Sequence, residues 1–131
     1  MKKLLLVLFL ILAFPLYAEA ATYYVDASCG SSGNGTTASC GASGPWKTLA
    51  EASAAVTSAN TISVESGTYA EVLTETHSGT NSSNYLYWVA TGGTAIVSQI
   101  VISGNYVKIE GFSVRNTPWA NNDGAFNISG D

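Results

Sequence analysis

The chain has 131 residues, enough for one small domain, and its five Lys and Arg stand against nine Asp and Glu, a formal net charge of −4 at pH 7. A field of that sign repels phosphate backbones, so we expect no nucleic-acid partner. No segment after residue 20 is apolar enough to cross a bilayer, which excludes a membrane-spanning mature protein.

The first 20 residues have the three parts of a secretory signal peptide. Lys2 and Lys3 precede the short apolar run Leu4–Phe14, and Ala18-Glu19-Ala20 is a small-x-small cleavage site. A membrane anchor is the alternative, but the apolar run is shorter than the ~20 residues that a spanning helix needs. We therefore expect residues 1–20 to be removed and the mature protein to be secreted, periplasmic or at the cell surface.

The two cysteines, Cys29 and Cys40, lie on either side of the segment GSSGNGTTAS. Export would place them in an oxidising compartment, where a disulfide persists. A metal or redox pair is the alternative, but the spacing fits neither C-x-x-C nor a usual zinc pattern. We expect a structural disulfide that closes a loop too rich in Gly and Ser to order itself.

The mature chain opens with TYYVDAS (22–28), whose alternation predicts a strand with Tyr23 and Val25 on one face. A Gly-rich loop follows and leads to WKTLAEASAAV. There, Thr48 and Glu51 have the spacing of a capping box, which predicts a short helix over Thr48–Val56.

Everything after Asn60 reads as short strands joined by tiny turns. The expected strands are 61–64, 68–73, 85–90, 95–97, 99–102, 106–114 with a kink at Gly111, and 125–128. Residues 74–84 are expected to form a polar loop. Since no second helix is available to cover a sheet, the strands must cover one another.

A sequence repeat shows how they do so. IVISGN (100–105) returns as FNISGD (126–131), and Ile62, Tyr87 and Ile109 recur at similar spacing. Periods of ~20–30 residues with one strand-turn-strand unit each are typical of a solenoid, here a β-helix of parallel coils. The expected inward columns contain Ile62, Val64, Val89, Ile102, Ile109 and Ile128. A β-sandwich is the alternative, although its strands usually run longer.

Four stretches, in this order, resemble the start of the right-handed parallel β-helix proteins of the pectin lyase-like superfamily. They are TYYVDAS, GPWKTLAEA, TISVESGTYAE and NYVKIEGFSVRN. The resemblance implies an all-β fold for residues 21–131: a right-handed parallel β-helix, or solenoid, of two to three coils. The short N-terminal α-helix would cap the first coil.

That superfamily contains polysaccharide lyases, glycoside hydrolases and non-enzymatic surface proteins. The resemblance therefore implies an exported protein that binds or degrades polysaccharide, with a non-catalytic adhesin or structural β-helix protein as the alternative. Lyases of this type bind calcium and use a Lys or Arg as base, and hydrolases use carboxylate pairs. Those residues lie on middle coils, so no catalytic residue is assigned, this chain is expected to lack a complete active site, and calcium is expected only in a longer parent.

The last repeat ends at FNISGD, whereas IVISGN continues directly into YVKIEGFSV. Without that next strand, an apolar core end and a strand edge would be open to solvent. We therefore expect residues 21–131 to be the truncated N-terminal part of a longer β-helix domain. The alternative is that a partner, or self-association, covers the open end.

The best binding candidates are Arg115, Trp119 and Asp123 in the loop RNTPWANND. An aromatic ring beside polar side chains can stack on a sugar while its neighbours bond the hydroxyls, although Trp119 could instead pack back on the coil. Asn122 and Asp131 complete a weak candidate calcium set with Asp123.

The remaining ionisable candidates read as surface groups. His77, the only histidine, is expected in a solvated loop with Glu75 nearby in sequence. Lys108 and Glu110 alternate with apolar residues on a strand and are expected to form an exposed ion pair of little energetic value.

Overall fold

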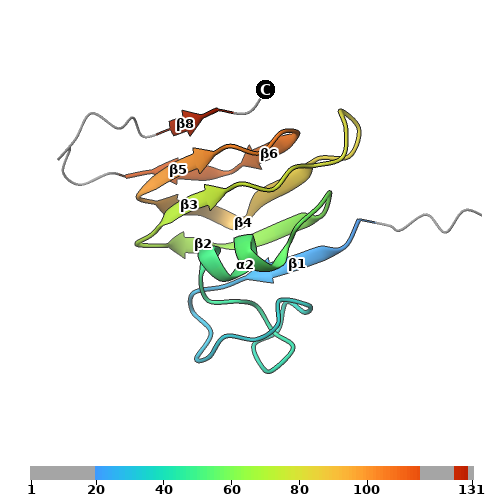
Figure 1. Cartoon of the computed structure of the whole chain (residues 1–131). Coiled ribbons are helices and arrows are strands. Elements are labelled where there is room, and N and C mark those ends of the chain that lie inside the picture. Colours follow the sequence, from blue (N-terminus) through green and yellow to red (C-terminus); the bar gives the residue numbers. More distant parts are fainter. Residues whose placement is uncertain (1–19, 116–125, 130–131) are drawn as a thin grey trace, which may run out of the picture.

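The computed structural model describes residues 20–115 and 126–129, so the signal peptide predicted for residues 1–20 lies almost wholly outside the described residues. In chain order the elements are β1 (Thr22–Val25), α2 (Leu49–Ala55), β2 (Thr61–Thr68), β3 (Val72–Glu75), β4 (Leu86–Val97), β5 (Gln99–Ile102), β6 (Val107–Glu110), β7 (Phe112–Val114) and β8 (Phe126–Ile128). The described part is mostly β with one short helix, as predicted (Figure 1).

The strands form two sheets in which every pair of named strands is parallel. The first sheet has the order β1-β2-β4-β6, with β7 also paired to β4, and the second has the order β3-β5-β8. From β2 onward the chain passes alternately through the two sheets (Figure 1). This parallel pairing excludes, for the described residues, the antiparallel sandwich that the sequence left as an alternative.

The strand register tests the repeat seen in the sequence. Ile100 and Ile102 of β5 lie beside Phe126 and Ile128 of β8, as the alignment of IVISGN with FNISGD predicts. In the first sheet, however, Ile62 lies beside Trp88, which lies beside Ile109. The predicted match to Tyr87 was wrong by one residue.

That slip changes which side chains of β4 point inward. Because side chains alternate along a strand, a one-residue error exchanges its two faces. Trp88 is fully buried, whereas Val89, predicted inward, lies on the outer face beside Ser63. Burying Trp88 is more favourable than burying Val89, because the Trp side chain removes more apolar area from water.

The first sheet bends along a line of glycines. The pairing of β2 with β4 shifts register between Glu65 and Gly67, and opposite this point Gly92 has φ 71°. A Cβ at Gly92 would collide with the carboxylate of Glu65. Gly111, with φ 79°, separates β6 from β7 at the same bend, as the kink predicted there requires.

The core lies between the inner faces of the two sheets and under the helix. Its most deeply buried apolar members, each at most 1% exposed, are Val25, Leu49, Ala52, Val56, Ile62, Val64, Leu73, Leu86, Trp88, Ala95, Val97 and Ile100. They come from β1, α2, β2, β3, β4 and β5, so one apolar core joins all the early elements.

Helix α2 has the predicted capping box and lies at the β1 end of the sheets (Figure 1). Its seven residues begin one residue later and end one residue earlier than predicted, because Thr48 and Val56 are its extended caps. Leu49 and Ala52 turn inward, and the Ser53 hydroxyl donates to the Thr74 carbonyl oxygen at 2.7 Å.

The outer edge of β1 is closed by the Gly-rich loop. The Tyr24 N–H donates to the Gly35 carbonyl at 2.9 Å, and the Trp46 N–H donates to the Tyr24 carbonyl at 3.0 Å. The Trp46 ring stacks on Tyr23 with the centroids 5.6 Å apart. The β1 strand therefore has bonding partners on both sides.

The predicted disulfide is present in this loop. Cys29 and Cys40 are joined by an S–S bond of 2.04 Å, with their Cα atoms 5.5 Å apart. The bond closes the segment that covers β1, so the covalent link stabilises the covered edge.

Two sequence boundaries were wrong around β3. The predicted strand 68–73 is interrupted, since Thr68 ends β2 and β3 begins only at Val72. The predicted polar loop 74–84 begins too early, because Thr74 and Glu75 belong to β3. Glu75 is fully buried. Because a carboxylate is rarely buried, the sequence pattern did not predict that Glu75 faces the core.

Candidate functional site

The sugar-binding loop predicted from the sequence is only partly described. Arg115 follows β7 and is exposed, and its N–H donates to the Val97 carbonyl at 2.8 Å. Its side chain borders a shallow hollow with Thr94 and Phe112. Trp119 and Asp123 lie outside the described residues, so their relation to Arg115 stays a prediction.

A different groove lies at the start of β4, on the outer side of the first sheet. Its volume is about 280 Å³. Its lining consists of Ala59, Thr61, Ser83, Asn84, Tyr85, Tyr87 and Lys108, together with Ala20, the last residue of the predicted signal peptide. Two aromatic rings, a lysine, an amide and two hydroxyls thus share one surface depression.

Parallel register builds the floor of this groove. Thr61 on β2 lies beside Tyr87 on β4, and Tyr87 lies beside Lys108 on β6. Neighbouring strands lie ~4.8 Å apart, so the three side chains form a row across the sheet. Leu86 and Trp88, on either side of Tyr87, are buried and hold it outward.

The loop before β4 forms the groove wall. The Asn81 Oδ1 accepts from the Ser83 N–H at 2.8 Å, and the Thr80 N–H donates to the Asn84 carbonyl at 2.9 Å. An Asx turn of this kind orders a polar loop without an apolar core. The order extends to Tyr85, whose side chain is 41% exposed.

Charged and aromatic groups meet at Tyr87. Its hydroxyl donates to Glu110 Oε2 at 2.6 Å, and the Lys108 Nζ lies 3.2 Å from the same oxygen and 4.5 Å from the centre of the Tyr87 ring. The exposed ion pair predicted for Lys108 and Glu110 is confirmed, with a tyrosine added to it.

This contact shifts three pKa values. The hydrogen bond from Tyr87, followed by that from Lys108, lowers the pKa of the Glu110 carboxyl. The hydrogen bond to Glu110 raises the pKa of the Tyr87 hydroxyl and that of the Lys108 ammonium. At neutral pH, Lys108 is therefore held in its charged form.

The arrangement suits a sugar better than a catalytic step. Tyr85 and Tyr87 offer ring faces, and Thr61, Asn84 and Lys108 offer donors around them. This groove was not predicted from the sequence, because matching Tyr87 to the inward Ile62 and Ile109 places Tyr87 on the inner face. The alternation of Tyr85 and Tyr87 around the apolar Leu86 was the available signal.

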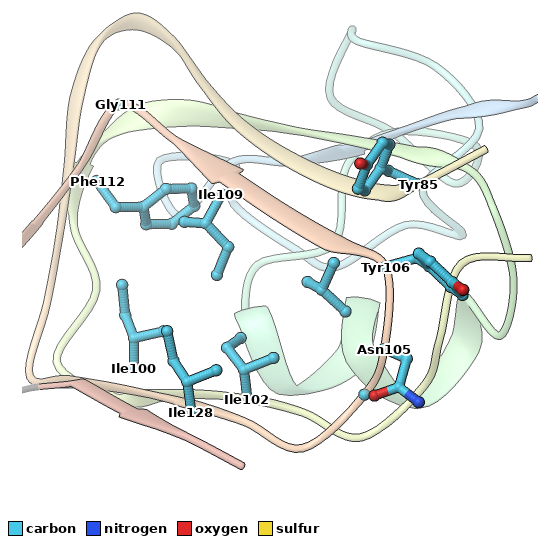
Figure 2. A pocket seen from close by; sticks show the side chains of 11 residues that line it. Tyr85, Ile100, Ile102, Asn105, Tyr106, Ile109, Gly111, Phe112 and Ile128 are labelled. Atoms are coloured by element: carbon cyan, nitrogen blue, oxygen red, sulfur yellow. The ribbon is translucent and has the colours of Figure 1, made fainter. Parts of the chain in front are cut away.

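A larger hollow of about 540 Å³ opens at the β6 end of the core. Figure 2 shows its apolar wall, with Ile100, Ile102, Ile109, Phe112 and Ile128 pointing into it. Tyr85 and Tyr106 lie at its rim with ring centroids 6.4 Å apart. Ile128 is 71% exposed, so this predicted core column lies open on the side of β8.

The structure also brings Glu75 and His77 together. Glu75 Oε1 accepts from the His77 N–H at 2.7 Å and lies 3.0 Å from His77 Nδ1. The Trp88 Nε1–H donates to Glu75 Oε2 at 3.0 Å. His77 follows β3 outside the strands and is 33% exposed, and its ring is held at the buried Glu75 carboxylate.

In the described residues, one cluster has donor types found in metal sites: Asp26 with Cys29 and Cys40. Both sulfurs belong to the disulfide, and metals bind thiolates, so this group does not fit a metal. The calcium ligands suggested by the sequence, Asn122, Asp123 and Asp131, lie outside the described residues.

Across residues 20–115 and 126–129, the structure contains no helix with the length and apolarity needed to cross a membrane. Comparisons of the chain with protein-family models, with curated proteins and with solved structures find no match.

Proposed function

We propose that this chain is part of an exported right-handed parallel β-helix protein that binds or degrades polysaccharide. Its groove at Tyr85 and Tyr87 binds sugar. The resemblance of four ordered stretches to the pectin lyase-like superfamily supports this function, and the composition of the groove supports sugar binding there. The proposal has three supports: the topology, the disulfide and the composition of the groove.

The topology supports the β-helix. The chain passes alternately through two parallel sheets, and successive passes lie beside one another in each sheet. A chain that does this in one rotational sense winds as a coil, and strand crossovers between parallel strands are almost always right-handed. The matching of IVISGN to FNISGD by strand register is the pairing that stacked coils require.

The Cys29–Cys40 disulfide supports export. Such a bond is typical of an oxidising compartment. Together with the predicted signal peptide, it favours the periplasm, the cell surface or the medium, which are the places where a protein meets intact polysaccharide.

The groove supports sugar binding and is the observation that carries the proposal. A pyranose has an apolar face and a rim of hydroxyls, so it needs an aromatic surface bordered by hydrogen-bonding groups. Tyr85 and Tyr87 supply rings, with the Lys108 Nζ lying over one face of Tyr87, while Thr61 and Asn84 border them. The Lys108 ammonium bonds to Glu110 through one of its three N–H groups, and the others are donors for a uronate carboxylate.

Affinity electrophoresis of the chain in gels that contain neutral or uronate-rich polysaccharides tests this proposal. We expect retardation, strongest for the uronate-rich gel, and an affinity about tenfold weaker for Tyr85→Ala or Tyr87→Ala. Val72→Ala, which removes an exposed apolar side chain from the second sheet, serves as the control and should bind normally. Equal migration of all variants, or no retardation in any gel, would contradict sugar binding at this groove.

A specific observation favours the alternative, a non-catalytic adhesin. A lysine that acts as a base must lose its proton near neutral pH, whereas Glu110 raises the pKa of Lys108. Assays for unsaturated uronates and for new reducing ends distinguish the two functions. Cleavage by the chain supports an enzyme, whereas retardation without cleavage shows that the groove of residues 21–131 binds sugar without acting on it.

A further inference from the structure

The first sheet has one free edge within the described residues. β6 is last in the order β1-β2-β4-β6 and pairs only with β4, and β8 is last in the second sheet and pairs only with β5. Between these two edges lies the apolar hollow of Figure 2. Unpaired strand edges beside exposed apolar surface are the usual route to strand pairing between chains.

The opposite end of the stack is a poorer partner for this edge. The Tyr24 N–H and carbonyl groups bond to Gly35 and Trp46, and the Asp26 N–H donates to the Trp46 carbonyl at 2.8 Å. The disulfide closes the same loop. Among the described strands, the edge of β1 is therefore already bonded, which disfavours head-to-tail stacking of copies and leaves the β6 edge of a second copy as a partner for β6.

We propose that two copies of the chain join end to end about a two-fold axis, with β6 antiparallel to the β6 of the second copy. Backbone direction limits the register to those in which Val107 and Ile109 bond across the axis, and the charges described below select among them. The Leu86 N–H donates to the Tyr106 carbonyl at 3.0 Å, so Tyr106 turns its polar backbone groups toward β4. By alternation, Val107 and Ile109 turn theirs toward the free edge.

An axis at Ile109 satisfies these groups. Two facing copies of Ile109 then exchange both N–H···O bonds, as in an antiparallel hydrogen-bonded pair. Their side chains, which line the hollow, meet at the core end together with Phe112 and Ile128. The apolar hollow of each copy is thus covered by the same hollow of the other copy, as in any two-fold interface.

The same register produces charge complementarity. With Ile109 opposite Ile109, residue 108 faces residue 110, so each Lys108 lies opposite the second copy's Glu110. Both side chains are more than half exposed on the outer face. Opposite charges directly across an antiparallel pair are stabilising, and like charges there are destabilising.

Sedimentation equilibrium of the exported chain tests the assembly, with charge variants as probes. We expect the wild-type chain to be a dimer. Lys108→Glu alone places acid opposite acid, and Glu110→Lys alone places base opposite base. Each should raise the dimer dissociation constant at least tenfold.

Mixing the two single variants is the decisive measurement. A heterodimer of Lys108→Glu with Glu110→Lys has opposite charges at both cross-strand positions, although the Lys108–Glu110 pair within each chain is lost. We expect the equimolar mixture to dimerise, and added salt to weaken it. Glu65→Lys, on β2 of the same face and away from the edge, is the control and should stay dimeric.

A wild-type monomer at every concentration would overturn the proposal, and so would assemblies larger than two. A mixture of the single variants that stays monomeric would overturn the antiparallel register. Circular dichroism of each single variant confirms that it is folded. Sedimentation is measured without sugar, so its outcome does not depend on the proposed sugar binding, although Lys108 belongs to both the groove and the cross-strand pair.

Discussion

The Trp88 indole Nε1–H donates a hydrogen bond of 3.0 Å to Oε2 of Glu75, and both side chains are fully buried. Trp88 belongs to β4 in the first sheet and Glu75 to the end of β3 in the second. The bond therefore crosses the core and joins the two sheets. The other carboxyl oxygen bonds to His77, so both oxygens of this buried acid have partners.

We expect Trp88→Phe to lower the free energy of unfolding by about 3 kcal/mol. The substitution leaves Glu75 Oε2 buried without its donor and leaves a small cavity beside it. Urea unfolding followed by circular dichroism measures the change.

Glu75→Met tests whether the unpaired carboxylate causes this loss of stability. In Trp88→Phe/Glu75→Met, no buried carboxylate is left unpaired, since replacing both partners of a buried pair by apolar groups is often nearly neutral. We expect the double variant to lose less stability than the sum of the single variants, by at least ~1 kcal/mol. Strict additivity would show that the bond across the core contributes nothing of its own.

Much of this architecture could be predicted from sequence because local patterns determine it. The capping box at Thr48 and Glu51, the disulfide pair and the repeat of IVISGN each depend on neighbours in sequence or on a fixed period, and the structure contains all three. The error at Tyr87 was a slip of one residue within a correctly identified strand. Alternation alone could not decide between Trp88 and Val89, because both are apolar.

The site was less predictable because it depends on contacts across the fold. Glu75 was predicted to be a loop residue. Burying its carboxylate is favourable only because Trp88 and His77 donate hydrogen bonds to it, and the sequence does not show that these residues are neighbours. The groove likewise needs Thr61, Tyr87 and Lys108 in adjacent strands, and these are 26 and 21 positions apart. Of the three residues predicted to bind sugar, Arg115 is the one that the structure describes. It follows β7, which pairs with the last residues of β4, whereas the groove lies at the start of β4.

Tyr69 gives the protein a pH dependence at alkaline pH. Its side chain is 3% exposed, and the hydroxyl donates to the Glu65 carbonyl at 2.9 Å. Burial raises the pKa of Tyr69 from 10.0 to about 12. The unfolded chain therefore loses this proton first, so stability is full below pH 10 and falls as the pH rises to about 12.

We expect that fall to amount to about 2 to 3 kcal/mol and to be absent from Tyr69→Phe. The variant should lose about 1 kcal/mol at neutral pH, because it lacks the hydrogen bond to Glu65. Urea unfolding at a series of pH values measures both effects. The other tyrosines titrate in both proteins, so the difference curve isolates Tyr69, and parallel curves would show that its ionisation is not coupled to folding.

The capping box gives a second pH dependence, at acid pH. Burial acts to raise the pKa of Glu51, but hydrogen bonds from Ser32, Thr48 and Lys47 outweigh it and lower the pKa below 4.5. The stabilisation is therefore present above the ordinary pKa of a glutamate and is lost as the pH falls through the lower, folded value. Glu51→Gln should remove this part of the acid dependence.

We expect Thr48→Ala to cost about 1 kcal/mol at neutral pH, since the Thr48 hydroxyl accepts from the Glu51 N–H at 3.2 Å. Thr48→Ser retains the hydroxyl and should lose only a few tenths of that amount. Thermal unfolding ranks the variants. A Ser variant as unstable as the Ala variant would assign the effect to the Thr methyl group rather than to the cap.

The disulfide closes the loop that covers β1, so we expect it to stabilise the chain. Cys29 and Cys40 are 11 positions apart, and a loop of this size contributes about 2 to 3 kcal/mol on the chain-entropy model. We expect Cys29→Ser/Cys40→Ser to lose about that much stability. A thiol reductant should lower the wild-type value to that of the variant and leave the variant unchanged.

Opening this loop also weakens the cover over β1, where Gly35 and Trp46 hold the strand edge. An uncovered β1 edge can receive the free β6 edge of another copy, and such a head-to-tail contact does not close on itself. We therefore expect the Cys29→Ser/Cys40→Ser chain to form assemblies larger than a dimer. Light scattering during reduction of the wild-type chain measures this growth, and a reduced chain that remains dimeric would show that the loop covers β1 without its covalent bond.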